Sequence, residues 1–179
     1  MSRLQAITNT ISREGGFSNH ALDSGGKTMY GITEALARKY GYQGDMKDIS
    51  LDKTVEIYTK EFWDKLRIDE INDWRIQELV FDAGVNHGGS RSILLAQRGF
   101  NTLVKNKDEI VEDGIVGSQT LGALNGYSHR YYGKDPLIDA MILVRTEFYR
   151  AIVENRDSQT VFIVGWLRRI RKLEKAIGV

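Results

Sequence analysis

Apolar residues recur at three- and four-residue spacing along most of this chain, and polar caps or glycines bound these segments. Leu4, Ile7 and Ile11 share one face of a helix that Gly15–Gly16 should end. A single proline among 179 residues leaves few breaks in the pattern. Similar spacing predicts further helices over 33–40, 50–62, 76–85, from 90, from 118, over 135–153 and over 162–173. The chain is therefore expected to be mainly α.

The segment from Gly15 to Gly31 interrupts this helical pattern. It contains five glycines together with Asp23 and Ser24, and Gly25–Gly26 is expected to form a turn. The helical fold should therefore carry a small hairpin or loop lobe. A boundary near residue 90 would divide the chain into a domain over 1–90 and a helical module over 91–179 that packs on it.

Composition excludes several classes of function. Lys and Arg (25) nearly balance Asp and Glu (24). The chain therefore lacks the excess of basic residues that is typical of nucleic-acid-binding proteins, and no nucleic-acid partner is expected. No cysteine is present, and three scattered histidines show no metal-ligand spacing, so neither a metal nor a cofactor is expected. The apolar run 161–167 is too short to span a bilayer, and the N-terminus has no signal-peptide pattern. We expect a monomer made in the cytoplasm and not inserted in a membrane.

Glu14 is the strongest candidate for acid chemistry. A carboxyl group at a helix end beside flexible backbone suits a general acid, because partial burial favours the protonated form. A second carboxylate on a separate loop, Asp23, can stay ionised, and Thr28 can position a water molecule. A chain with 24 acidic residues offers many such pairs, so a helix-end charge and a loop cap remain the simpler interpretation of the pair alone.

The residues around this pair carry a family resemblance. The segment REGGFSNHALDSGGKTMYGIT (13–33) resembles the signature of glycoside hydrolase family 108, which is E-G-G-aromatic, then D-x-G-G-x-T, then G-I-T. Every position of that pattern is filled. The segments EFWDKLRIDEI (61–71) and LVFDAGVNHG (79–88) are similar to the next blocks of the family. Later segments, including EDGIVGSQTLGAL (112–124) and VFIVGWLRRI (161–170), resemble a helical peptidoglycan-binding module.

The resemblance implies a lysozyme-like muramidase whose partner is bacterial peptidoglycan. Such an enzyme hydrolyses the β-1,4 bond between N-acetylmuramic acid and N-acetylglucosamine, in phage lysis or in the release of proteins through the wall. It would act in the periplasm or on the cell wall. Transferred residue by residue, the resemblance makes Glu14 the general acid. The order of Glu14, Asp23 and Thr28 also resembles that of phage-type lysozymes, which implies that Asp23 and Thr28 hold the attacking water. The carboxyl groups of Glu14 and Asp23 are expected to face each other across a cleft. A separation of about 6.5–9.5 Å between them would indicate an inverting mechanism, and one of about 5 Å would indicate a retaining mechanism with a covalent intermediate.

Six further residues are expected to contact the substrate: Phe17, Tyr30, Trp63, Asp82, Asn86 and His87. Phe17 is the aromatic residue of the signature, and Tyr30 and Trp63 can stack on sugar faces. Trp63 also continues an apolar helix face, so core packing is its alternative role. Asn86 and His87 can line the cleft floor or cap a helix, and Asp82 can bind Asn86 or a substrate amide.

Two other functions remain open. A lytic transglycosylase would use the same glutamate and form a 1,6-anhydro product without water, whereas Asp23 and Thr28 favour hydrolysis. A non-catalytic peptidoglycan-binding accessory of secretion is the second alternative, and the intact Glu14 motif argues against it.

Overall fold

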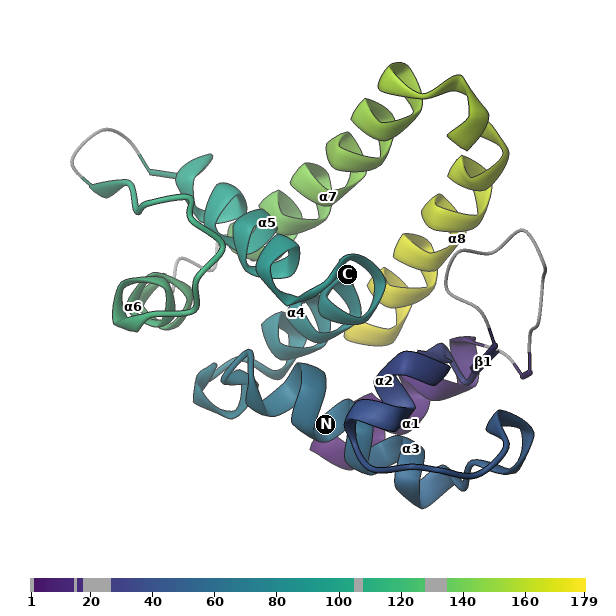
Figure 1. Ribbon diagram of the computed structural model, residues 1–179. Helices are drawn as coiled ribbons and strands as arrows, with labels where there is room; N and C mark the ends of the chain where they lie inside the picture. Colours follow the sequence, from purple (N-terminus) through teal and green to yellow (C-terminus); the bar gives the residue numbers. More distant parts are fainter. Residues whose placement is uncertain (1, 15, 18–26, 105–107, 128–134) are drawn as a thin grey trace. The chain divides into compact units, whose positions relative to one another are not determined.

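The computed structural model describes the chain except for residues 1, 15, 18–26, 105–107 and 128–134 (Figure 1). The chain divides into two compact units, Met1–Lys65 and Leu66–Val179. Each unit is described by itself.

The N-terminal unit combines helices with one short antiparallel hairpin. Thr33 and Ser50 cap its second and third helices, because their hydroxyl oxygens accept hydrogen bonds from Leu36 N (3.2 Å) and Lys53 N (3.1 Å). Both caps were predicted from the sequence and are confirmed. The elements are α1 Arg3–Glu14, β1 Thr28–Met29, β2 Ile32–Thr33, α2 Glu34–Lys39, the 3-10 helix η1 Met46–Asp48, α3 Leu51–Tyr58 and the π-helix η2 Thr59–Asp64.

The buried faces of α1 and α3 differ in part from the predicted faces. Ile7 and Ile11 are buried as expected, but Leu4 is 59% exposed, and α3 buries Ile57 while leaving Leu51 51% exposed. Both exposed leucines lie in the first turn of their helices. Apolar spacing alone cannot distinguish such end positions from the core face.

The C-terminal unit is a set of packed helices. Its elements are the 3-10 helix η3 Ile68–Glu70, α4 Trp74–His87, α5 Gly89–Asn101, α6 Ser118–Gly126, α7 Pro136–Asn155, the 3-10 helix η5 Asp157–Gln159 and α8 Thr160–Ile177. Helix α5 packs against α4, α6 and α7, and α8 packs against α7 and α4. Figure 1 shows α7 and α8 as the two arms of a hairpin joined through η5.

Two predicted caps in this unit differ in detail from the structure. Gly117 rather than Ser118 is the N-cap of α6, and Ser118 is its first helical residue. Asp135 precedes Pro136 at the start of α7 as predicted, but its carboxylate accepts a hydrogen bond from Arg75 Nη2 (2.8 Å) instead of capping the helix. A long-range ion pair has thus replaced the local cap.

The mainly α, lysozyme-like fold with a small hairpin is confirmed. In the sequence, the boundary between the two compact units lies between Lys65 and Leu66. Helices α4 and α5, which lie on either side of the predicted boundary near residue 90, pack against each other. That boundary stays a prediction. Among the described residues, no helix is both long and apolar enough to cross a membrane.

Close packing of α5 on α7 depends on Gly99, which supplies the first testable prediction. A Cβ atom there would lie 2.8 Å from Met141 Cγ and 3.0 Å from Met141 Cα. Gly99→Ala should therefore lower the free energy of unfolding by about 1–3 kcal/mol, measured by urea titration with circular dichroism. Gly122→Ala, in α6 with no atom near its Cβ position, should instead raise it by about 0.5–1 kcal/mol. Equal effects at the two glycines would contradict this role of Gly99.

Candidate functional site

The predicted site residues fall into two groups, one in each unit. Glu14, Phe17, Thr28, Tyr30 and Trp63 belong to the N-terminal unit. Asp82, Asn86 and His87 belong to the C-terminal unit. Asp23 and the expected Gly25–Gly26 turn lie outside the described residues, so the separation between the carboxyl groups of Glu14 and Asp23 stays a prediction.

A two-residue turn at Tyr30 and Gly31 shapes the N-terminal site. The hairpin pairs Thr28 with Thr33 and Met29 with Ile32, so that only Tyr30 and Gly31 connect the strands. Both have positive φ angles, 52° for Tyr30 and 74° for Gly31. Positive φ at both positions is typical of a type I′ turn, which matches the twist of a hairpin. Glycine suits the second position because it adopts this conformation without steric cost.

Glu14 ends α1 and packs against this turn. A Cβ atom at Gly31 would lie 3.0 Å from Glu14 Cγ and 2.9 Å from Tyr58 Oη. The Tyr58 hydroxyl donates a hydrogen bond to the Tyr30 carbonyl oxygen (2.8 Å), which fixes the turn against α3. The Glu14 side chain is half-buried, with Oε1 fully covered. A carboxyl group is thus held at a helix end by a rigid turn, which is the setting expected for a positioned acid.

The other candidates of this unit have different surroundings. Thr28 begins β1, on the hairpin whose turn contacts Glu14, and its side chain is half-buried. Phe17 is half-buried beneath the Lys47 ammonium group, 5.1 Å from the ring centroid. Trp63 is only 2% exposed. Its burial favours core packing, the alternative role, and substrate contact by Trp63 stays a prediction.

An ion cluster around Glu61 was not predicted from the sequence. The Glu61 carboxylate accepts hydrogen bonds from Lys39 Nζ (2.9 Å), Tyr40 Oη (2.6 Å) and Lys65 Nζ (2.7 Å). Burial opposes the charged form of Glu61, but these donors outweigh it and lower its pKa to about 2. A carboxylate held ionised in this way cannot donate a proton near neutral pH, so Glu61 is not a candidate for a general acid.

In the C-terminal unit, Asp82 is the centre of a buried charge cluster. Its carboxylate is fully buried and contacts Arg145 Nη2 at 2.6 Å and Arg169 Nη2 at 2.9 Å. Burial opposes its ionisation, but the two arginines outweigh burial and lower the pKa of Asp82 to about 2. Asn86 Nδ2 donates to the Asp82 carbonyl oxygen (2.6 Å), in keeping with the contact predicted between these residues.

His87, the last residue of α4, extends this cluster. Its Nε2 lies 2.9 Å from Tyr149 Oη, and the Tyr149 hydroxyl also accepts from Arg145 Nε (3.1 Å). Burial, with a further contribution from the positive charge of Arg145, lowers the pKa of His87 to about 4. His87 is therefore neutral at pH 7, and with Asp82 it serves the packing of α4, α7 and α8. Substrate contacts by Asp82, Asn86 and His87 stay predictions.

Sequence reasoning missed the partners of these residues. Tyr58 was assigned to an apolar helix face, although its hydroxyl was a signal that a polar contact would accompany burial. Arg145 and Arg169 come from distant helices, and no local pattern links them to Asp82. Within the described parts of the chain, no group of three or more His, Cys, Asp or Glu residues is arranged to hold a metal ion.

Two protein-family models match consecutive parts of the sequence. Residues 7–88 match the model described as glycosyl hydrolase 108, and residues 91–171 match the model described as "Predicted Peptidoglycan domain". Among solved structures, that of SagA from Brucella abortus is similar, with a TM-score of 0.75 and 21% sequence identity. That similarity covers 97% of this chain and 91% of the SagA chain, and it shows a shared fold alone. None of the curated proteins matches this chain.

The contact between Gly31 and Glu14 generates a prediction with a matched control. Gly31→Ala places a methyl group against Glu14 and Tyr58 in addition to straining a positive φ angle. Gly41→Ala strains a similar φ angle of 81° with no atom near the new methyl group. Gly41→Ala should lower the free energy of unfolding by about 1–2 kcal/mol and Gly31→Ala by about 2–4 kcal/mol, both measured by urea titration. Equal losses would contradict close packing at Gly31.

The lowered pKa of His87 predicts a pH dependence of stability. Between pH 6.5, the ordinary value, and about pH 4, the unfolded chain binds a proton at His87 that the folded chain does not. The free energy of unfolding should therefore fall as the pH decreases through this window, by on the order of 2 kcal/mol. His87→Gln should flatten this slope most clearly above pH 5.5, because Glu61 and Asp82, with ordinary pKa values of 4.5 and 3.8, add their own losses only below about that pH. An unchanged slope in that variant would contradict the prediction.

Proposed function

Through residues 7–88 the chain belongs to glycosyl hydrolase family 108, joined to a peptidoglycan domain over residues 91–171, and from this we propose that it is a peptidoglycan muramidase. The family makes the chain a glycoside hydrolase, and the second domain indicates peptidoglycan as its substrate. The proposed reaction is hydrolysis of the β-1,4 bond between N-acetylmuramic acid and N-acetylglucosamine.

One observation carries the assignment of Glu14 as general acid. Within the family match, Glu14 is the carboxyl group at the end of α1 whose side chain packs against the hairpin turn at Gly31. In the proposed mechanism Glu14 protonates the glycosidic oxygen as the bond to C1 of N-acetylmuramic acid breaks.

The remaining roles are proposed from the hairpin and from the order of the residues in the sequence. Thr28 lies on the strand that leads into the turn against Glu14, and we assign it to holding the attacking water. Asp23 would accept the proton that this water loses as it bonds to C1. Phe17 and Tyr30, both half-buried, offer aromatic surface for the sugar rings.

The reaction suits two settings: phage-type lysis of the host and release of secreted proteins through the wall. In both settings the enzyme would be made in the cytoplasm and would act on the wall outside the inner membrane.

Glu14→Gln tests the proposed mechanism. The amide cannot donate the required proton, so clearing of purified sacculi should slow by about 10²–10⁴-fold. Glu56→Gln is the matched control, because Glu56 is half exposed and pairs with Lys53 and Lys60 on the surface. This variant should clear walls at the wild-type rate. Mass spectrometry of the products should show reducing N-acetylmuramic acid ends.

Three results would contradict the proposal in different ways. Anhydro-muramyl ends would show a lytic transglycosylase, which uses the same glutamate without water. Equal clearing by the wild type and Glu14→Gln would remove Glu14 from the mechanism, and no clearing by the wild type would favour a binding protein.

A further inference from the structure

The α7–α8 hairpin of the C-terminal unit encloses a groove of about 480 Å³. This α7–α8 groove is lined chiefly by Arg91, Phe148, Asn155, Arg156, Gln159 and Trp166. Its volume lies within the range of about 300–1,000 Å³ for small-ligand sites. We infer that the groove binds a muropeptide, with the sugars on its aromatic wall and a carboxylate held by Arg91 and Arg156. The inference rests on the proposed function and names the part of the substrate that this unit would recognise.

The aromatic wall of the groove is held rigid from behind. Trp166 stacks on the fully buried Tyr149, with ring centroids 5.1 Å apart and planes 23° apart. Tyr149 is itself fixed by its contacts to His87 and Arg145. Trp166 is only half-buried and lines the groove together with Phe148, so part of the aromatic surface remains open. Rigid aromatic surface suits the apolar C–H face of a pyranose ring, because little side-chain freedom is lost on binding.

The groove also carries polar groups that match peptidoglycan. Asn155 and Gln159 bring amide groups to its lining, which pair naturally with N-acetyl groups and peptide bonds. Arg91 and Arg156 have exposed side chains, and the Arg91 guanidinium lies 5.3 Å from the centroid of the Phe148 ring. Neither arginine forms an ion pair with a carboxylate of the described residues. A planar guanidinium binds carboxylates through two parallel hydrogen bonds.

The charge of a neighbouring hollow determines which way round a ligand would bind in the groove. It has a volume of about 530 Å³, shares Phe148 and Ala151 with the α7–α8 groove, and carries Glu109, Glu112 and Glu147. Arg98 also lines this hollow and pairs with Glu112 (3.0 Å), but the carboxylates outnumber it, so the carboxylate of a ligand belongs at the end of the α7–α8 groove that carries Arg91 and Arg156. A muropeptide meets each requirement, since it combines N-acetyl sugars, peptide bonds and free carboxylates. A membrane surface fits less well, because the site is concave and lined by amides.

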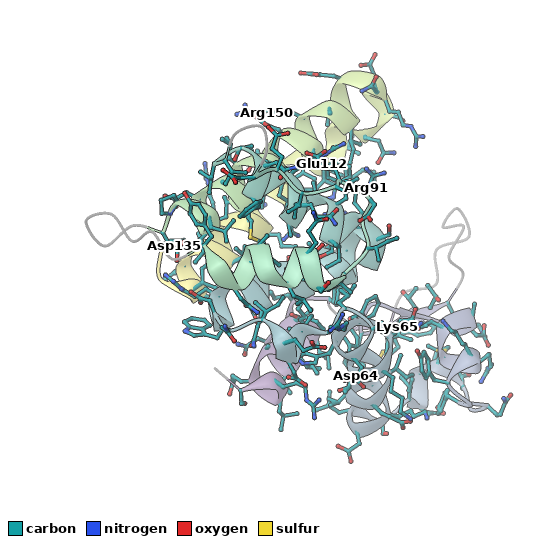
Figure 2. All side chains as sticks on the ribbon, turned by 90° about the vertical axis from the view of Figure 1, so that its left-hand side faces the viewer. Asp64, Lys65, Arg91, Glu112, Asp135 and Arg150 are labelled. Atoms are coloured by element: carbon teal, nitrogen blue, oxygen red, sulfur yellow. The ribbon has the colours of Figure 1, made fainter. Side chains whose placement is uncertain are left out.

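Charge reversal tests this assignment with a matched control. The double variant Arg91→Glu and Arg156→Glu is compared with Arg150→Glu and Arg171→Glu, two exposed arginines that do not line the groove. Figure 2 shows Arg91 and Arg150 at separate places on this unit. All proteins also carry Glu14→Gln, so that the ligand is not digested. Isothermal titration measures binding of a purified disaccharide-tetrapeptide and of chitotetraose, which has N-acetyl sugars but no carboxylate.

We expect the groove variant to bind the disaccharide-tetrapeptide at least tenfold more weakly than the parent, and the control variant to bind it within twofold. Binding of chitotetraose should change less than threefold in either variant. The milder double variant, Arg91→Gln with Arg156→Gln, should bind the disaccharide-tetrapeptide with an affinity between those of the parent and the charge-reversed groove variant. An unchanged thermal unfolding temperature would show that the variants are folded.

Three results would overturn the inference: equal binding by the groove variant and the parent, equal losses in the groove and control variants, or a parent that binds phosphatidylglycerol vesicles but not the muropeptide. The test is separate from that of the proposed function. Muropeptide binding that depends on Arg91 and Arg156 would support the inference even if the wild type failed to hydrolyse walls. Hydrolysis without such binding would support only the proposed function.

Discussion

The buried carboxylate of Asp82 is the interaction on which the C-terminal unit depends. It links α4 to α7 through Arg145, 63 residues away, and to α8 through Arg169, 87 residues away. Removing three charges from water is costly, and only close pairing with well-placed hydrogen bonds offsets that cost. The cluster therefore favours one arrangement of the three helices, because any shift that separated a partner would leave a buried charge uncompensated.

In the N-terminal unit the comparable constraint is steric. Tyr30 and Gly31 turn the chain within two residues, and Gly31 brings the backbone so close to Glu14 that no other side chain fits without displacement. The Tyr58 hydroxyl holds the turn from the other side. The helix that ends at Glu14 and the turn that packs on it thus both constrain the position of this side chain.

Local patterns in the sequence account for much of this fold, and long-range contacts account for what they missed. The caps at Thr33 and Ser50 and the helix beginning at Pro136 were predictable because each depends on a few adjacent residues. Spacing placed Leu4 and Leu51 on core faces, but helix ends are open to solvent. The family signature identified Glu14 as a candidate from the sequence. The contact of Glu14 with Gly31 and the pairing of Asp82 with two arginines could not be predicted, because they arise only when distant segments pack together.

Side-chain contacts through Tyr149 connect the buried charge cluster of the C-terminal unit to the α7–α8 groove. Tyr149 contacts His87 and Arg145 through its hydroxyl, and the face of its ring supports Trp166 in the wall of the groove. A change at Asp82 would release Arg145, then Tyr149, and so loosen a ligand surface that Asp82 does not line. Residues that do not line the groove can therefore affect binding there, since they hold its aromatic wall in a single geometry before a ligand binds.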